Sequence, residues 1–260
     1  MTILDEIAEY ARERVIKQKE IMSLEEVRSK ALSLPKKDFA FERAFKKDGI
    51  SFICDCKKAS PSKGIIAEEF PYLDIALSYE KAGADAISVL TEPKWFLGRD
   101  EYLAEISSKV NIPCLRKDFV VDEYMIYEAA VLGASAVLLI CSILSVSEIK
   151  RYIGICDELG LSALVEAHDE AEVNMAIEAG ARIIGVNNRN LKDFSVDTNN
   201  RKKLRALIPN DVLFVSESGV KGPEDIKEIK DMGADAALVG ETLMRAVDKS
   251  QKLKELKSLL

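Results

Sequence analysis

The segments AGADAISVL (82–90) and LGASAVLLI (132–140) carry the pattern that decides the fold, a glycine followed by a short apolar run. Similar segments recur as LGLSALVE (159–166), AGARIIGVN (179–187) and MGADAALVG (232–240). In each of them the glycine follows an amphipathic stretch and suits the left-handed position that ends a helix. Because a strand buried on both faces reads as a near-continuous apolar run, the repeat predicts helices alternating with buried parallel strands.

Three further apolar segments complete the set of predicted strands: ISFICDCK (50–57), IPCLRK (112–117) and VLFVSE (212–217). The chain from Gly49 to Leu260 then offers about 26 residues to each of eight units, which suits one strand and one helix per unit. Eight such units predict an α/β fold, a closed (β/α)8 TIM barrel. An open, doubly wound sheet is the alternative.

The predicted helices carry start signals, and a helical extension precedes the barrel. The signals are Asp122-Glu123 for 123–132, Ser145 or Ser147 for 147–159, Asp169 for 169–179 and Gly222-Pro223 for 223–232. Within residues 1–48, Ile3, Ile7, Ala11 and Val15 are spaced as on one helix face, and Ser23-Leu24-Glu25-Glu26 forms a capping box. We expect one domain over residues 1–260, with the extension packed on the barrel.

Composition narrows the class of protein. Of the 260 residues, 48% are apolar and 31% charged, as in ordinary globular proteins. No apolar run approaches the roughly 20 residues that span a bilayer, and the start MTILDEIAEY has acidic residues where a signal peptide would carry lysines. The net charge of −7 and the lack of a basic tract argue against nucleic acid as a partner.

Cysteine and histidine usage limits the chemistry further. The five cysteines are odd in number and lie mostly in apolar runs, which argues against a disulfide framework and for a cytoplasmic location. The single histidine, His168, excludes a multi-histidine zinc site, and any Ser-His-Asp triad would have to use it. We expect His168 to lie in the loop after its strand.

Polar side chains gather where the predicted strands end, which is where barrels of this type carry their chemistry. The residues are Asp55 and Lys57, Lys117, Glu166, Asn187 and Arg189, and Glu217 and Ser218. The period of two along the first strand places Asp55 and Lys57 on one face and Cys54 and Cys56 on the other, so the charged pair should point inward. A single such residue could simply meet solvent above the core. Together, lysines and an arginine facing carboxylates resemble acid–base machinery.

Two glycine turns predict a phosphate site. SESGV (216–220) and LVGET (238–242) follow the seventh and eighth strands, and backbone N–H groups in such turns can hold a phosphate. Ser60 could add a hydroxyl, while Lys58 and Lys63 could add positive charge to a site whose own groups nearly cancel. A small phosphorylated molecule is therefore the expected ligand.

The chain resembles the indole-3-glycerol phosphate synthase family along nearly its whole length. The matching stretches are KKASPSKG (57–64), SVLTEPKWFLG (88–98), RKDFVVDEYMIYEA (116–129), LVEAHDEAE (164–172), GVNNRNL (185–191), SESGV (216–220) and LVGETLMR (238–245). The resemblance implies closure of the indole ring of 1-(2-carboxyphenylamino)-1-deoxyribulose 5-phosphate with loss of carbon dioxide and water. It implies neither cofactor nor metal.

The resemblance also implies residue roles. Lys117 would be the general acid that protonates the ketone oxygen, and Glu166 the acid–base partner in the dehydration, although which of Lys57 and Lys117 acts in each step stays open. The other implied catalytic residues are Lys57, Asp55, Glu217 and Asn187. The implied substrate contacts are Arg189, Ser218, Phe96 and Phe119, with Trp95 bordering the same pocket or simply packed in the core. Ser60, Gly219, Gly240 and Glu241 would hold the phosphate.

One position departs from the family pattern, and rival functions stay open. The family's first strand commonly reads Glu-x-Lys, where this chain has Asp55-Cys56-Lys57. A phosphoribosylanthranilate isomerase or another sugar-phosphate barrel is one alternative, although Cys54 and Cys56 face the wrong way for the isomerase's acid–base pair. A non-catalytic phosphate-binding barrel is the other. We expect a monomer that associates at most weakly with other tryptophan-pathway enzymes.

Overall fold

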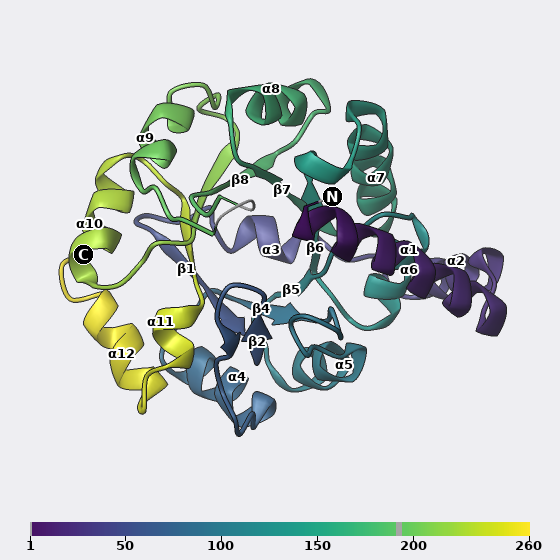
Figure 1. Cartoon of the computed structure of the whole chain (residues 1–260), viewed down its shortest axis with the longest axis horizontal. Helices are drawn as coiled ribbons and strands as arrows, with labels where there is room; N and C mark the ends of the chain where they lie inside the picture. Colours follow the sequence, from purple (N-terminus) through teal and green to yellow (C-terminus); the bar gives the residue numbers. More distant parts are fainter. Residues whose placement is uncertain (1, 191–193) are drawn as a thin grey trace.

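The computed structural model describes residues 2–190 and 194–260, and its centre is a closed parallel barrel (Figure 1). Eight strands run in the order β1-β10-β9-β8-β7-β6-β5-β4, and β4 pairs with β1 to close the ring. Their bounds are β1 Ser51–Cys56, β4 Ala86–Leu90, β5 Cys114–Lys117, β6 Ala136–Ile140, β7 Ser162–Ala167, β8 Ile183–Asn187, β9 Leu213–Glu217 and β10 Ala236–Val239. All eight predicted strands are present, and the closed barrel is confirmed over the open sheet.

Helices surround the barrel and follow the strands in turn. They are α4 Tyr72–Lys81, α5 Asp100–Lys109, α6 Tyr124–Val131, α7 Val146–Leu159, α8 Glu170–Glu178, α9 Asn199–Arg205, α10 Pro223–Asp231, α11 Glu241–Met244 and α12 Lys249–Leu256. Ser145 caps α7 in a capping box with Glu148, so Ser145 rather than Ser147 opens this helix. Gly160 ends it in the left-handed conformation, with φ of 72°.

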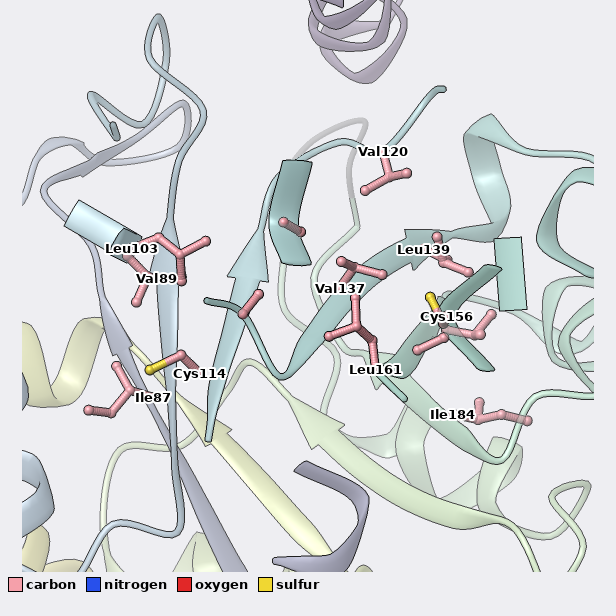
Figure 2. Close-up of a cluster of buried hydrophobic side chains, with 14 of the residues drawn as sticks. Ile87, Val89, Leu103, Cys114, Val120, Val137, Leu139, Cys156, Leu161 and Ile184 are labelled. Carbon is pink, nitrogen blue, oxygen red and sulfur yellow. The ribbon is translucent and has the colours of Figure 1, made fainter. Parts of the chain in front are cut away.

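The period of two along the strands separates two cores. Inside the barrel lie inward-facing residues such as Ile53, Leu115 and Leu164. The alternate positions face the helices and form the larger outer core, part of which is shown in Figure 2. Cys54 and Cys56 belong to this outer core, as expected from the strand period. All five cysteines are buried free thiols.

The N-terminal segment forms three helices, α1 Ile3–Ile21, α2 Leu24–Ser33 and α3 Ala40–Arg43. Ile7, Ala11 and Val15 of α1 are buried, and the predicted capping box of α2 joins Ser23 to Glu26. Helix α2 packs against α6. The predicted helical extension is therefore present and lies against the barrel (Figure 1).

Helix α3 closes one end of the barrel, which the sequence pattern did not predict. Phe41 and Phe45 belong to the inner core, with ring centroids 4.7 Å apart in an edge-to-face arrangement. Figure 1 shows α3 in the centre of the ring of strands. A short antiparallel pair, β2 Ala59–Ser60 and β3 Gly64–Ile65, was also not predicted; it forms the loop after β1. No helix in the described part of the chain is long and apolar enough to cross a membrane.

Candidate active site

A cavity of about 700 Å³ opens at the carboxyl ends of the strands. This volume is within the usual range of small-molecule sites. The residues expected at the site that line it are Asp55, Lys57, Ser60, Phe96, Lys117, Phe119, Glu166, Asn187, Arg189, Glu217, Ser218, Gly219, Gly240 and Glu241. The structure thus gathers these residues around one cavity; of the two lysines expected near the phosphate, Lys63 lines it and Lys58 does not. Leu191, the last residue of the motif GVNNRNL, is outside the described residues.

Lys117 is at the centre of the charged groups. Its Nζ lies 2.7 Å from Glu217 Oε2 and 3.1 Å from Glu166 Oε2. Side chains two positions apart on a strand point to the same face. Lys117, Glu166 and Glu217 each follow an inward-facing core residue by two positions, and these core residues are Leu115, Leu164 and Val215. The end of β5 therefore points its ammonium group between the carboxylates that end β7 and β9.

The pKa values of these groups are pushed in different directions. Burial alone would lower the pKa of Lys117, but the carboxylates of Glu217, Glu166 and Asp55 outweigh it, so the pKa is raised and the amine stays protonated. Burial raises the pKa of Glu217; the Lys117 ammonium offsets this only in part, and the Glu166 charge adds to it. For Glu166 the effect of burial is outweighed by Lys117, His168 and Asn187, so its pKa is lowered. The site holds a charged acid beside two unlike carboxyl groups.

Glu217 also explains a glycine whose role the sequence pattern did not reveal. A Cβ atom on Gly185 of β8 would lie 2.1 Å from Glu217 Oε1. Since such a contact is too short for any side chain, the Glu217 carboxylate occupies the space that a larger residue would need. Within the described residues, Glu217 Oε1 is buried and has no hydrogen-bond partner.

Asp55 and Lys57 form a second ion pair, with Nζ 3.1 Å from Oδ2. The shorter side chain at this position therefore still reaches its lysine, and Asp55 is buried, with 2% of its surface exposed. A Cβ atom on Gly240 would lie 2.5 Å from Asp55 Oδ2 and 2.8 Å from Lys57 Nζ. Glycine at 240 therefore leaves room for this pair as well as for a ligand.

The ends of β8 and β9 are joined through Asn187. Its Oδ1 accepts hydrogen bonds from the Ser218 hydroxyl at 2.9 Å and from the Arg189 backbone N–H at 3.0 Å. The carboxamide NH₂ is then left to face Glu166, whose charged form Asn187 favours. Arg189 donates to the carbonyl of Phe194 at 3.1 Å, which holds the guanidinium at the cavity wall.

The expected phosphate residues lie together at one side of the cavity. Gly219 has a φ of 90°, a conformation that favours glycine, and Gly240 directly precedes the short helix α11. Ser60 is buried and lies in the β2–β3 pair. Two cations accompany them, since Glu241 Oε1 lies 3.0 Å from Arg245 Nε and 3.5 Å from Lys63 Nζ. Arg245 was not singled out in the sequence, because it lies a full turn beyond the LVGET glycine.

Aromatic rings form another wall. The rings of Phe96 and Phe119 are 5.8 Å apart, and both line the cavity. Trp95 is not one of the lining residues; it packs edge-on against Tyr10 of α1, with a centroid distance of 5.6 Å. Glu92 is buried and accepts hydrogen bonds from the backbone N–H groups of residues 94–96, which fixes the loop that carries Phe96.

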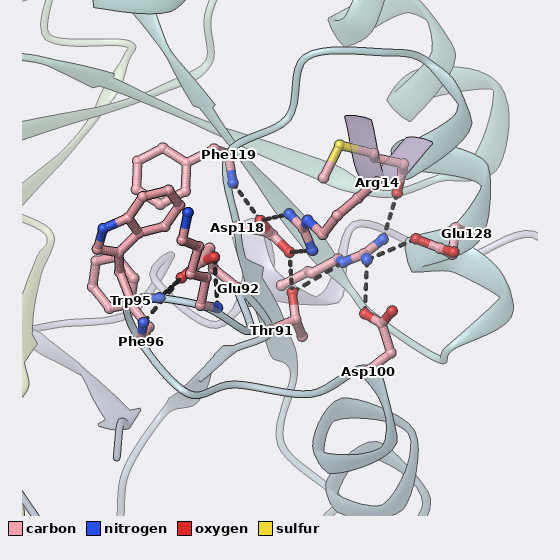
Figure 3. Close-up of polar contacts among 12 residues, drawn as sticks. Arg14, Thr91, Glu92, Trp95, Phe96, Asp100, Asp118, Phe119 and Glu128 are labelled. Carbon is pink, nitrogen blue, oxygen red and sulfur yellow. Dashed lines mark hydrogen bonds and ion pairs between the residues drawn. The ribbon is translucent and has the colours of Figure 1, made fainter. Parts of the chain in front are cut away.

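Figure 3 shows a polar network that includes Arg14, Thr91 and Asp118, the residue that follows β5. Arg14 of α1 makes a two-point contact with Asp118, at 2.6 and 3.2 Å, and the Thr91 hydroxyl donates to the same carboxylate. Fully buried Arg116 donates to Thr91, Asp100 and Glu128. The pattern of polar strand ends did not predict these outward-facing residues. They tie the helical extension to the strand that carries Lys117.

The extension also contributes to the cavity directly. Ile3, Leu4 and Ile7 of α1 are among its lining residues. The helical spacing of these residues predicted packing on the barrel, but not a place at the cavity. Among the described residues, no group of three His, Cys, Asp or Glu side chains is arranged to hold a metal ion.

His168 lies closer to the charged centre than its place in the sequence suggested. It follows β7 directly, and its Nε2 atom lies 3.4 Å from Glu166 Oε1. On the other side of the ring, Nδ1 lies 3.0 Å from Glu172 Oε2 of α8. The predicted loop position is confirmed, and the ring keeps the same face as Glu166, as the period of two along the strand indicates.

Comparison with known proteins identifies the family. The family model described as indole-3-glycerol phosphate synthase matches residues 4–256. A protein of that name from Ruminiclostridium cellulolyticum is 56% identical over 256 residues, covering 98% of both chains. Another from Endomicrobium trichonymphae is 52% identical, covering 98% of this chain and 99% of its own.

A solved structure supports the fold alone. A thiamine phosphate pyrophosphorylase from Pyrococcus furiosus aligns with a TM-score of 0.61 and 15% identity, covering 84% of this chain and 96% of its own. The sequence relatives favour the synthase over the isomerase and over a non-catalytic barrel. From its full-length family match and its close relatives, the chain belongs to the indole-3-glycerol phosphate synthase family, carboxy-lyases of tryptophan biosynthesis.

Proposed function

We propose that the residues around the cavity close the indole ring of 1-(2-carboxyphenylamino)-1-deoxyribulose 5-phosphate in two acid–base stages, with Lys117 as the general acid. The observation that carries this proposal is the Lys117 ammonium between Glu217 and Glu166, at 2.7 and 3.1 Å. Attack by the aromatic ring carbon places negative charge on the ketone oxygen, so a protonated donor must stand ready. The raised pKa of Lys117 keeps the amine protonated.

Glu166 is the acid–base partner in the dehydration. Its lowered pKa makes it a carboxylate before the reaction starts, able to take a proton from the substrate. Glu217, whose pKa is raised, and Asn187 orient the reacting centre. Asp55 holds Lys57 at 3.1 Å, where the lysine binds substrate and shares in the proton transfers.

The substrate's two ends are recognised by different walls. The anthranilate ring lies between Phe96 and Phe119, with its carboxylate toward Arg189 and Ser218. Its phosphate is held by Ser60, Gly219, Gly240 and the backbone of Glu241. The glycine turns support this orientation, because their backbone N–H groups follow β9 and β10, the seventh and eighth strands of the barrel along the chain.

The test uses the product's own signal. The purified chain is incubated with the carboxyphenylamino-deoxyribulose phosphate while indole fluorescence is followed, with Lys117→Ala as the control. Fluorescence that grows with the native chain and is lost in the variant supports both the reaction and its acid. Growth at equal rates in both proteins would reject Lys117 as the acid.

The phosphate assignment has a separate test. Gly240→Ala places a methyl group against Asp55 and Lys57, so we expect weaker substrate binding together with slower turnover. Inorganic phosphate should inhibit the native chain competitively and the variant more weakly. We further propose that the chain acts in the cytoplasm as a monomer and as one domain, which sedimentation at assay concentrations would test for the oligomeric state.

A further inference from the structure

The reaction leaves the enzyme one proton short in each turnover. The substrate's carboxylate departs as neutral carbon dioxide, and the ketone oxygen departs as water. One hydrogen of that water comes from the substrate's CH₂ group, which becomes the ring CH. The other has to come from solvent, by way of the residues that donate it. The cavity therefore needs a group that can return a proton to the Lys117–Glu166 pair.

His168 joins Glu166 to the protein surface. Glu166 is 4% exposed, whereas Ser142, in the 3₁₀ turn Cys141–Ile143, is exposed. Between them stands the imidazole of His168, with Nε2 3.4 Å from Glu166 Oε1 and Nδ1 3.0 Å from Glu172 Oε2. The Ser142 hydroxyl lies 3.4 Å from Nδ1 and donates to Glu172 Oε1. The chain of groups runs from the cavity to solvent.

The ring's protonation state follows from its neighbours. Glu172 is a carboxylate, because hydrogen bonds from His168 and Ser142 lower its pKa in spite of burial, so Nδ1 must carry a hydrogen to donate. Nε2 is buried and has no hydrogen-bond partner among the described residues, yet it faces Glu166. In the imidazolium form Nε2 carries a hydrogen, and Glu166 Oε1, 3.4 Å away, is the acceptor that faces it.

The other charged groups around the ring are also accounted for. Burial would lower the pKa of His168, but the carboxylates of Glu172 on α8, Glu166 on β7 and Glu217 on β9 raise it. Asn200 of α9 donates to the backbone carbonyl of His168. These carboxylates therefore favour the imidazolium form of His168 over the neutral ring.

We propose that His168 is a positioning residue that acts through Glu166 and returns to it the proton consumed in each turnover. The Nε2–H bond of the imidazolium breaks and an O–H bond forms on Glu166, while the electron pair stays on nitrogen. Glu166 then passes a proton to the neutral Lys117 amine, 3.1 Å away, which restores both the carboxylate and the ammonium group for the next turnover. The neutral imidazole keeps its Nδ1–H on Glu172 and regains a proton from solvent between turnovers. This inference rests on the acid–base role proposed for Glu166.

The variant His168→Gln tests the transfer itself. A carboxamide can still donate N–H to Glu166, but it cannot release or accept a proton under these conditions. We expect kcat to fall by about 100-fold, the lower end of the range for proton transfer by a side chain. Imidazole in the buffer should restore part of the loss. We also expect the native kcat to fall as pH rises and His168 loses its proton, and this fall should disappear from the profile of the variant.

A matched control separates chemistry from structure. Asp169 caps α8 by accepting from the Glu172 N–H at 2.9 Å and lies beside His168 in sequence. Asp169→Ala should loosen the same helix start, lowering Tm without altering the pH profile or responding to imidazole. Thermal melts of both variants report whether either has lost its fold.

Two results would overturn the proposal. One is a His168→Gln enzyme with native kcat and native pH profile. The other is a loss of kcat that imidazole does not restore and that Asp169→Ala reproduces, which would mark a structural role. Glu166→Gln separates a failure of the role proposed for Glu166 from a failure of the role proposed for His168. Full activity in that variant would reject the acid–base role of Glu166 itself.

Discussion

Gly185 offers a way to move Glu217 without removing it. In Gly185→Ala the new Cβ atom would start 2.1 Å from Glu217 Oε1 and 3.2 Å from Leu164 Cδ1. Since carbon and oxygen atoms in contact stay about 3.5 Å apart, the carboxylate must retreat by more than about 1 Å. Its other oxygen is 2.7 Å from Lys117 Nζ, so the retreat breaks the closest contact of the proposed acid.

The size of the effect follows from this displacement. A misplacement of about 1 Å at a reacting group costs on the order of 100-fold, so kcat/KM should fall by about that factor. This corresponds to about 2.7 kcal/mol of lost transition-state stabilisation. Overpacking at a buried site costs about 1–3 kcal/mol, which leaves the barrel folded at assay temperature.

The assay is initial-rate indole fluorescence over a range of substrate concentrations, with urea unfolding as the check on stability. Gly154→Ala in α7 is the matched control, because a Cβ atom there meets nothing within 4 Å. It should leave kcat/KM unchanged and raise the free energy of unfolding by about 0.5–1 kcal/mol.

A double variant tests whether Gly185→Ala acts through the Glu217 carboxylate. If Gly185→Ala acts through the carboxylate, adding it to Glu217→Gln should cost much less than the sum of the two separate losses. A Gly185→Ala enzyme with kcat/KM within threefold of the native value would show that the position of Glu217 does not matter. Full additivity would show that the methyl group acts elsewhere.

Three further predictions concern the same site and its support. Lys117→Met should lower kcat by about 10²–10⁴-fold while Tm shows that the barrel stays folded, and single-turnover fluorescence would measure it. Arg14→Met strands buried Asp118, so urea unfolding at pH 7 should show a loss of about 3 kcal/mol. Burial alone would raise the pKa of Asp118, but Arg14 and Arg116 outweigh burial and lower the pKa below its ordinary value of 3.8. The ion pair therefore stabilises the fold above about pH 4 and loses this effect as Asp118 is protonated at lower pH. The difference in unfolding free energy between the native chain and Arg14→Met should then shrink below about pH 4. Asp55→Glu should stay active with altered turnover, and unchanged kcat and substrate affinity would show that this side chain is not limiting.

Local patterns predicted the parts of the fold that depend on neighbouring residues. The apolar runs gave the eight strands, and the period of two put Asp55 and Lys57 inside with Cys54 and Cys56 outside. The convergence of Lys117, Glu166 and Glu217 then followed from barrel closure, because the carboxyl ends of all strands meet at one face.

The contacts that the sequence did not predict are mostly between segments far apart in the chain. Arg14 meets Asp118 across 104 positions, and neither residue has a local signal for the other. Gly185 looked like a routine strand residue, since its need for glycine comes from a side chain on β9. The period of two places His168 on the face of Glu166, but the 3.4 Å contact depends on how the chain turns after β7.

Phe41 and Phe45 close one end of the barrel, and this limits how ligands enter and leave the cavity. In the described part of the chain they fill one end of the inner core, so the cavity opens at the other end. The same opening must then admit the substrate and release carbon dioxide, water and the indole product. A bound product molecule therefore blocks the next substrate, and the product has to leave before the next turnover can begin.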